Sequence, residues 1–208
     1  MTKISSPYTA ALTGAGFLQD EMTAILPMLI SPEADTLLED EKRYNRVLHI
    51  NAETSRKKAI GEFKRRYKSV PPGFWHDFLN LSKEDQTIAL FFVMLKTYKI
   101  LFDFHVNVTM RKWNSVVRQV ELSDLMIEFY EIAARDAFVD TWSDATKKKV
   151  AGSYLTMLKK VGMVDHQGAL QTLSCGNLDY YLRIGEPWFL EACLLQPYQI
   201  ENIKKSLS

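Results

Sequence analysis

Two groups of cationic side chains have the residue types and spacing that phosphate binding requires. The first group lies between residues 147 and 160, and the second lies between residues 56 and 68. The first comprises Lys147, Lys148, Lys149, Lys159 and Lys160, with the polar Ser153 between them. The second comprises Arg56, Lys57, Lys58, Lys64, Arg65, Arg66 and Lys68. Lysine and arginine neutralise backbone phosphates and release counterions, so both groups predict sequence-independent contacts with a nucleic acid.

A helix is expected to carry the first group. Ser143 or Asp144 can cap its first turn, and Gly162 stands where a glycine ends a helix. Its apolar face recurs at helical spacing and consists of Val150, Tyr154, Leu158 and Val161. A polar turn around Gln167 and Gly168, between two short apolar segments, predicts a β-hairpin. A helix that leads into such a hairpin is typical of winged-helix proteins, with Asp165–Gly168 as the wing tip.

Lys147, Lys148 and Lys149 lie near the positive end of this helix dipole. Cations at that end cost about 0.3 to 1 kcal/mol each when they are exposed, and Asp144 offsets only part of this. A phosphate bound there would gain from the lysines and from the free N–H groups together. The alternative interpretation is a solvated amphipathic helix followed by an ordinary hairpin.

The second group is expected on a helix from about Glu53 to Tyr67. On a helical projection, Ile60, Phe63 and Tyr67 cluster on one side. The opposite side carries Lys57, Lys58, Lys64, Arg65 and Lys68. Arg56 projects near the apolar side, so its stem is expected to pack while its head reaches water or a partner. The alternative is a solvated face offset by the stretch Asp20–Glu41, whose charged residues are all acidic.

Composition predicts a soluble cytoplasmic protein with no membrane partner. The formal net charge is +1 and hydrophobic residues make up 47% of the chain, as in ordinary globular proteins. Cys175 and Cys193 offer neither a disulfide framework nor metal-ligand spacing. The N-terminus lacks the apolar core of a signal peptide, and the most apolar tract, Ile88–Leu95, is too short to span a bilayer.

The pattern is helical almost throughout. It predicts a mainly α fold, a multi-helix bundle whose winged-helix-like C-terminal part contains a small β-hairpin. The expected division is an N-terminal helical domain, 1–120, and a winged-helix-like domain with C-terminal helices, 121–208. Helices are expected over Ile100–Val108 and Arg111–Val120, and Ser123 is expected to cap Asp124–Arg135. Asp124–Arg135, Asp136–Trp142 and Asp144–Val161 would supply the three helices of the winged-helix fold.

No enzyme is expected. The chain has no phosphate-binding loop, no zinc-protease motif and no hydrolase nucleophile elbow. Asp40-Glu41-Lys42 resembles nuclease metal ligands only superficially, because those ligands need a strand scaffold. Asp103 and His105 point to different helix faces at a spacing of two residues. The sequence therefore predicts no catalytic residues, no cofactor and no metal site.

Several segments of the chain form a family-level pattern. They are Tyr8–Leu18 followed by Glu21, Arg43–Arg46 with Asn51, Ser55–Lys58 and Phe63–Tyr67. Together these segments resemble the BrxA family of bacteriophage exclusion (BREX) defence systems. The resemblance implies a small helical protein, likened to the RNA-binding antitermination factor NusB and carried in operons beside a DNA methyltransferase. It also implies nucleic-acid binding in an anti-phage system, with no enzymatic step of the protein's own.

These observations together predict a non-enzymatic protein of a BREX system that binds nucleic acid and prefers double-stranded DNA. Other BREX proteins, including the methyltransferase, are expected partners. Two alternatives remain open: a protein–protein adaptor within the defence complex, and RNA binding of the NusB-like kind.

Overall fold

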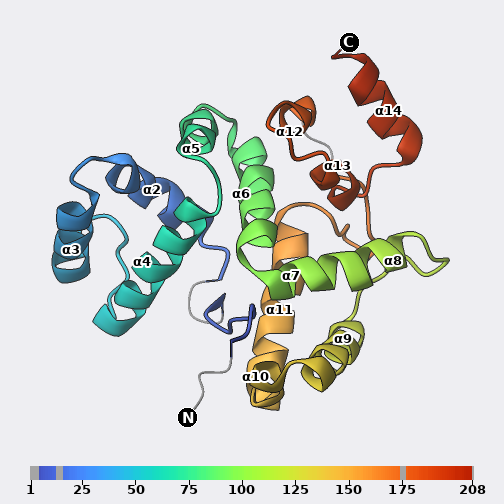
Figure 1. Cartoon of the computed structure of the whole chain (residues 1–208), viewed down its shortest axis with the longest axis horizontal. Helices are drawn as coiled ribbons and strands as arrows, with labels where there is room; N and C mark the ends of the chain where they lie inside the picture. The colour runs from blue at the N-terminus through green and yellow to red at the C-terminus, as the bar shows by residue number, and fades with distance from the viewer. Residues whose placement is uncertain (1–4, 13–15, 174–176, 208) are drawn as a thin grey trace.

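The chain is mainly helical, as its sequence pattern predicts (Figure 1). The structure, a computed structural model, describes residues 5–12, 16–173 and 177–207. Its helices are α2 (Gln19–Ile30), α3 (Ala34–Tyr44), α4 (Glu53–Lys68), α5 (Pro72–Leu79), α6 (Lys83–Thr97), α7 (Lys99–Phe104), the π-helical η1 (His105–Thr109), α8 (Met110–Trp113), α9 (Leu122–Arg135), α10 (Ala137–Asp140), α11 (Asp144–Lys160), α12 (Asp179–Arg183), α13 (Trp188–Ala192) and α14 (Pro197–Lys205).

Helix α6 lies at the centre of the molecule. The hydroxyl of Ser82 caps it by accepting a hydrogen bond from the backbone N–H of Asp85 at 3.1 Å. Every residue of the tract Ile88–Leu95 is buried, so the most apolar part of the sequence is core on all sides of the helix. Helices α2 to α5 lie on one side of α6, and α7 continues from its end toward the other side (Figure 1).

Helices α7, η1 and α8 follow one another without a break, and the C-terminal helices pack around this continuous helical segment, called the rod below (Figure 1). His105 in η1 is fully buried and contacts the hydroxyl of Tyr154 in α11 and the carbonyl of Ala192 in α13, each at 2.8 Å. A π-helical turn is rare and occurs mostly as a single turn inserted between α-helical segments. Here it accompanies the histidine that ties α11 and α13 to the rod.

The predicted helix over Arg111–Val120 is wrong. Helix α8 ends at Trp113, and Gln119 forms an antiparallel bridge with Ala169. The pairing of Gln119 with a segment 50 residues away competes with local helix propensity, and the tertiary contact wins. Ser123 is not the cap of α9; Glu121 is, in a capping box with Asp124.

The segment after α11 contains little regular β-structure. Val164 and Leu170 form one antiparallel bridge, and Gln119 and Ala169 form another. Among the described residues, no strand is longer than these single bridges. The division of the chain into 1–120 and 121–208 stays a prediction.

The structure bears on the expected absence of a membrane span and on one of the two cysteines. Within residues 5–12, 16–173 and 177–207, no helix combines the length and the apolar composition that crossing a bilayer requires. Cys193 is buried, and Cys175 lies outside the described residues.

Candidate nucleic-acid interface

Helix α11 has the boundaries and the apolar face that its sequence predicts. The hydroxyl of Ser143 accepts a hydrogen bond from the backbone N–H of Thr146 at 3.2 Å, and Gly162 follows the helix with φ 77°. One face packs inward against α9. The buried residues of that face include Val150, Ala151, Tyr154, Met157 and Leu158. The opposite face is therefore free to meet a partner.

Four of the predicted lysines lie on the outward face of α11. Lys148, Lys149, Lys159 and Lys160 are exposed and form no ion pair with any residue that the structure describes. A helix rises about 1.5 Å per residue, so Lys149 and Lys160 are roughly 16 Å apart along the axis. Residues eleven apart differ by only about 20° around the helix, so the two lysines share one face.

Lys147 does not belong to that face, and its expected exposure is wrong. Its side chain is 5% exposed, and Nζ lies 5.8 Å from the centre of the Tyr130 ring on α9. The reason is helical spacing: residue 147 precedes the buried Ala151 and Tyr154 by four and seven residues, so it projects toward α9 with them. Adjacency to Lys148 in the sequence does not place it beside Lys148 in space.

Ser153 lies between the lysines of the outward face. It is partly exposed, and its hydroxyl donates to the carbonyl of Lys149 at 2.9 Å, which leaves oxygen lone pairs for a further donor. Gly152 beside it faces open space, because a Cβ added there would meet no atom within 4 Å apart from its chain neighbours and the nearby backbone of its own helix. A glycine inside a helix costs stability relative to alanine and allows close approach of another backbone.

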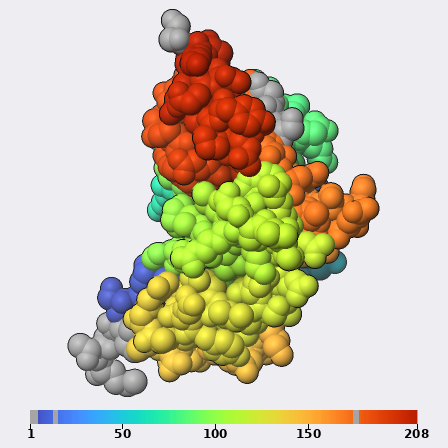
Figure 2. Space-filling view, turned by 90° about the vertical axis from the view of Figure 1, so that its right-hand side faces the viewer, coloured from blue at the N-terminus to red at the C-terminus, as the bar shows by residue number. Residues whose placement is uncertain are grey.

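The turn after α11 is closed by Asp165. Its carboxylate accepts hydrogen bonds from the backbone N–H groups of Gln167 at 2.8 Å and Ala169 at 2.9 Å, and Gly168 adopts φ 84°. In the space-filling view, the orange part of the chain that follows α11 projects from the body beside α8 (Figure 2). The turn Asp165–Gly168 is thus fixed in shape and accessible.

The second group, on α4, is divided by burial. Arg66 is fully buried, and its guanidinium donates to the carbonyl of Phe17 at 2.9 Å and to the hydroxyl of Tyr98 at 3.2 Å. Arg56 is 5% exposed, and it donates to the carbonyls of Lys42 at 2.9 Å and Ile50 at 2.6 Å. The expected access of both heads to solvent is wrong, because each guanidinium is buried and donates its hydrogen bonds to carbonyl groups of the protein.

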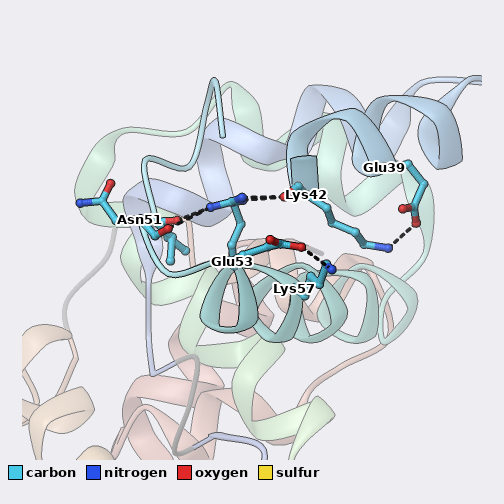
Figure 3. A network of polar contacts seen from close by, with 7 residues as sticks. Glu39, Lys42, Asn51, Glu53 and Lys57 are labelled. Atoms are coloured by element: carbon cyan, nitrogen blue, oxygen red, sulfur yellow. Dashed lines mark hydrogen bonds and ion pairs between the residues drawn. The ribbon is translucent and has the colours of Figure 1, made fainter. Parts of the chain in front are cut away.

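Ion pairs neutralise most of the remaining α4 cations. Lys64 contacts Asp35 of α3 at 2.8 Å, and the hydrogen bond from Lys64, together with its positive charge, lowers the pKa of that carboxyl. Arg65 contacts Glu62 at 3.4 Å. Figure 3 shows Lys57 paired with Glu53, and Lys42 of α3 paired with Glu39 in the same way.

Only Lys58 and Lys68 of the second group are exposed without an ion pair to a described residue. Their helix therefore presents far less free positive charge than its sequence predicts. The carboxylates that pair with these cations belong to α4 itself and to α3. For Lys64, whose partner Asp35 lies in the stretch Asp20–Glu41, the predicted alternative of compensation by acidic residues is correct.

A family model named BrxA matches residues 6–175, which is most of the chain. The chain belongs to the BrxA family. Membership implies a role in BREX phage defence, together with other BREX components. No curated protein matches the sequence.

A crystal structure of an uncharacterized protein from Magnetospirillum magneticum has the same fold as this BrxA-family chain. The two superpose with a TM-score of 0.77 at 20% sequence identity, over 90% of this chain and 98% of the other. At that identity the likeness concerns the fold alone.

Two exposed residues, one on α11 and one beside the turn that follows it, lie outside the predicted groups. Thr156 is exposed and completes a row with Lys149, Ser153 and Lys160 at spacings of three and four residues. This helical spacing is visible in the sequence and could have predicted its place on the face. Arg118 is exposed beside the turn, where its backbone carbonyl accepts from the N–H of Leu170 at 2.7 Å. No local signal places Arg118 there, because the contact joins distant segments.

Proposed function

We propose that this BrxA-family protein binds double-stranded DNA as a non-enzymatic component of cytoplasmic BREX defence, with other BREX proteins and their methyltransferase as partners. The observation that carries the proposal is the outward face of α11. It presents four lysines that form no ion pair with a described residue, around a row of hydroxyl groups and an outward glycine. The B-DNA major groove is about 12 Å wide and admits one helix.

In this proposal α9, α10 and α11 are the helices of a winged helix, and α11 is the recognition helix. The turn Asp165–Gly168 acts as the wing and contacts the flanking backbone. Support comes from the order of the three helices and from the two bridges that join Gln119, Val164 and the segment 169–170 behind the turn. Lysine contacts to phosphates set register and affinity without specifying sequence.

The proposed contact set is narrower than the two predicted groups. Lys148, Lys149, Ser153, Lys159 and Lys160 form the main site, and Lys58 with Lys68 provide a weaker second one. Lys57, Lys64 and Arg65 would have to leave their ion pairs before binding phosphate. We exclude Arg56, Arg66 and Lys147 from direct contact because they are buried.

A mobility-shift titration with a DNA duplex over a range of salt tests this assignment. The matched pair of variants is Lys149/Lys160→Ala on α11 and Lys58/Lys68→Ala on α4, since both remove the same charge from exposed positions. Each phosphate contact contributes about 0.9 to the slope of log affinity against log salt. The α11 variant should therefore lose about two units of slope, and the α4 variant should lose less.

Failure of the wild-type protein to bind duplex DNA at low salt would overturn the proposal. Equal loss of slope in both variants would show a diffuse electrostatic contact instead of a recognition helix. Competition by structured RNA against the duplex distinguishes the RNA alternative.

A protein–protein adaptor is the second candidate function. It is favoured by apolar side chains on the surface of α9, where Ile127 is 59% exposed and Tyr130 is 54% exposed. Co-purification with other BREX proteins, combined with no affinity for nucleic acid, would support the adaptor over the DNA-binding proposal.

A further inference from the structure

A pocket of about 290 Å³ lies between α5, the turn that follows it, and α12. Its walls are largely aromatic, formed by Phe74, Phe78, Tyr180 and Tyr181. The rings support one another: the centroids of Phe74 and Tyr180 are 6.2 Å apart, and those of Tyr180 and Tyr181 are 5.6 Å apart. Such a cavity is large enough for one long side chain and offers π faces to it.

The pocket also carries uncompensated negative charge. Asp77 and Asp85 line it, and neither forms an ion pair with a described residue. The lining includes one cation, Arg183, but its guanidinium lies 3.1 Å from Asp179, a carboxylate outside the lining. The free charge of the site is therefore that of two carboxylates beside aromatic rings.

One carboxylate is already oriented by an aromatic wall. The hydroxyl of Tyr180 donates to Oδ2 of Asp77 at 2.9 Å, and burial together with this bond raises the pKa of the Tyr180 phenol. The bond occupies one lone pair of Asp77 and leaves its other oxygen able to accept. The hydroxyl of Ser82 likewise donates to Oδ2 of Asp85 at 3.1 Å.

We propose that this pocket receives an arginine side chain from a partner protein. A guanidinium is flat, stacks on aromatic faces and donates several hydrogen bonds to carboxylates, so it matches both the walls and the acids. The two carboxylates also disfavour a nucleic acid here. The same pairing exists at the rim, where the guanidinium carbon of Arg183 lies 5.9 Å from the centre of the Tyr180 ring.

Titration of the full-length protein with a short arginine peptide, followed by amide NMR shifts, tests the proposal. The probe is an acetyl-Gly-Arg-Gly-amide peptide. Its control is the citrulline peptide, which has nearly the same shape without the charge. The arginine peptide should shift amides around Phe74–Asp85 and Tyr180–Arg183. The citrulline peptide should bind about fivefold more weakly, which is the upper end of the range for a partly exposed ion pair.

Asp77/Asp85→Asn is the matching variant, because asparagine keeps the side-chain shape and an acceptor oxygen. It should weaken arginine binding by about fivefold, while Asp40/Asp140→Asn, with the same charge removed from exposed positions elsewhere, should not. Equal binding of the citrulline peptide, or equal arginine binding by both variants, would overturn the proposal. Duplex DNA binding should be unchanged in Asp77/Asp85→Asn, so failure here and failure of the DNA-binding proposal are distinguishable.

Discussion

Acidification is expected to destabilise this protein through His105. The imidazole is completely buried, and both ring nitrogens are engaged: Nε2 donates to the carbonyl of Ala192, and Nδ1 accepts from the hydroxyl of Tyr154, each at 2.8 Å. The Tyr154 hydroxyl in turn lies 2.7 Å from the hydroxyl of Thr109, which donates to it. This chain of hydrogen bonds is complete only when the histidine is neutral.

Burial lowers the pKa of His105 from 6.5 to about 4. The unfolded chain therefore takes up a proton below about pH 6.5, whereas the folded chain does not until about pH 4. A group whose folded pKa is lower than its unfolded pKa in this way makes the protein less stable as the pH falls. At about 1.4 kcal/mol per pKa unit, the free energy of unfolding should fall by about 2 kcal/mol between about pH 7.5 and pH 5.

Urea unfolding of the wild type and of His105→Gln at the two pH values measures this contribution. The variant should be less stable at neutral pH because it loses packing and hydrogen bonds, but its stability should depend less on pH, by about 2 kcal/mol over the same range. His76→Gln, which changes an exposed histidine on α5, should keep the wild-type pH dependence. The same pH dependence in His105→Gln and in the wild type would refute the assignment.

Three further substitutions test the buried polar contacts, each by urea unfolding. Arg66→Ala should cost about 3 kcal/mol or more, because it leaves buried carbonyl groups without a donor, whereas Lys68→Ala on the same helix should change stability by less than about 0.5 kcal/mol. Tyr154→Phe should cost about 1 to 3 kcal/mol by leaving the groups on either side of its hydroxyl unpaired. Glu41→Gln should cost about 2 kcal/mol. The buried Glu41 carboxylate accepts backbone N–H groups at 2.8 to 3.1 Å, and glutamine would replace one of its oxygens by an NH2 group that also donates. The exposed Glu39→Gln should be nearly neutral. Costs below about 0.5 kcal/mol for all three would contradict the roles assigned to these contacts.

Much of the fold follows from patterns that the sequence displays openly. The apolar spacing of Val150, Tyr154 and Leu158 and the cap at Ser143 located α11 to within a residue or two. The tract Ile88–Leu95, the most apolar in the sequence, is buried throughout in the central helix α6. These signals are local, because helix periodicity and capping involve residues a few positions apart. The resemblance of the N-terminal segments also identified the BrxA family.

The exposure of the cations was decided by packing between distant segments. From the sequence alone, Arg66 is one more cation of a basic helix, but in the structure it donates to Phe17 and Tyr98. The sequence likewise gives no partner for Lys64, which pairs with Asp35 of α3 in the structure. The same holds for Gln119, whose pairing with Ala169 ended a helix that local propensity favoured. A charged side chain contributes to binding only if its head remains in water, and whether it does depends on which carbonyls and carboxylates the fold places next to it. Residue type and spacing do not reveal those neighbours. Only the tertiary structure could therefore reduce the candidate cations to the outward face of α11 and to Lys58 and Lys68 of α4.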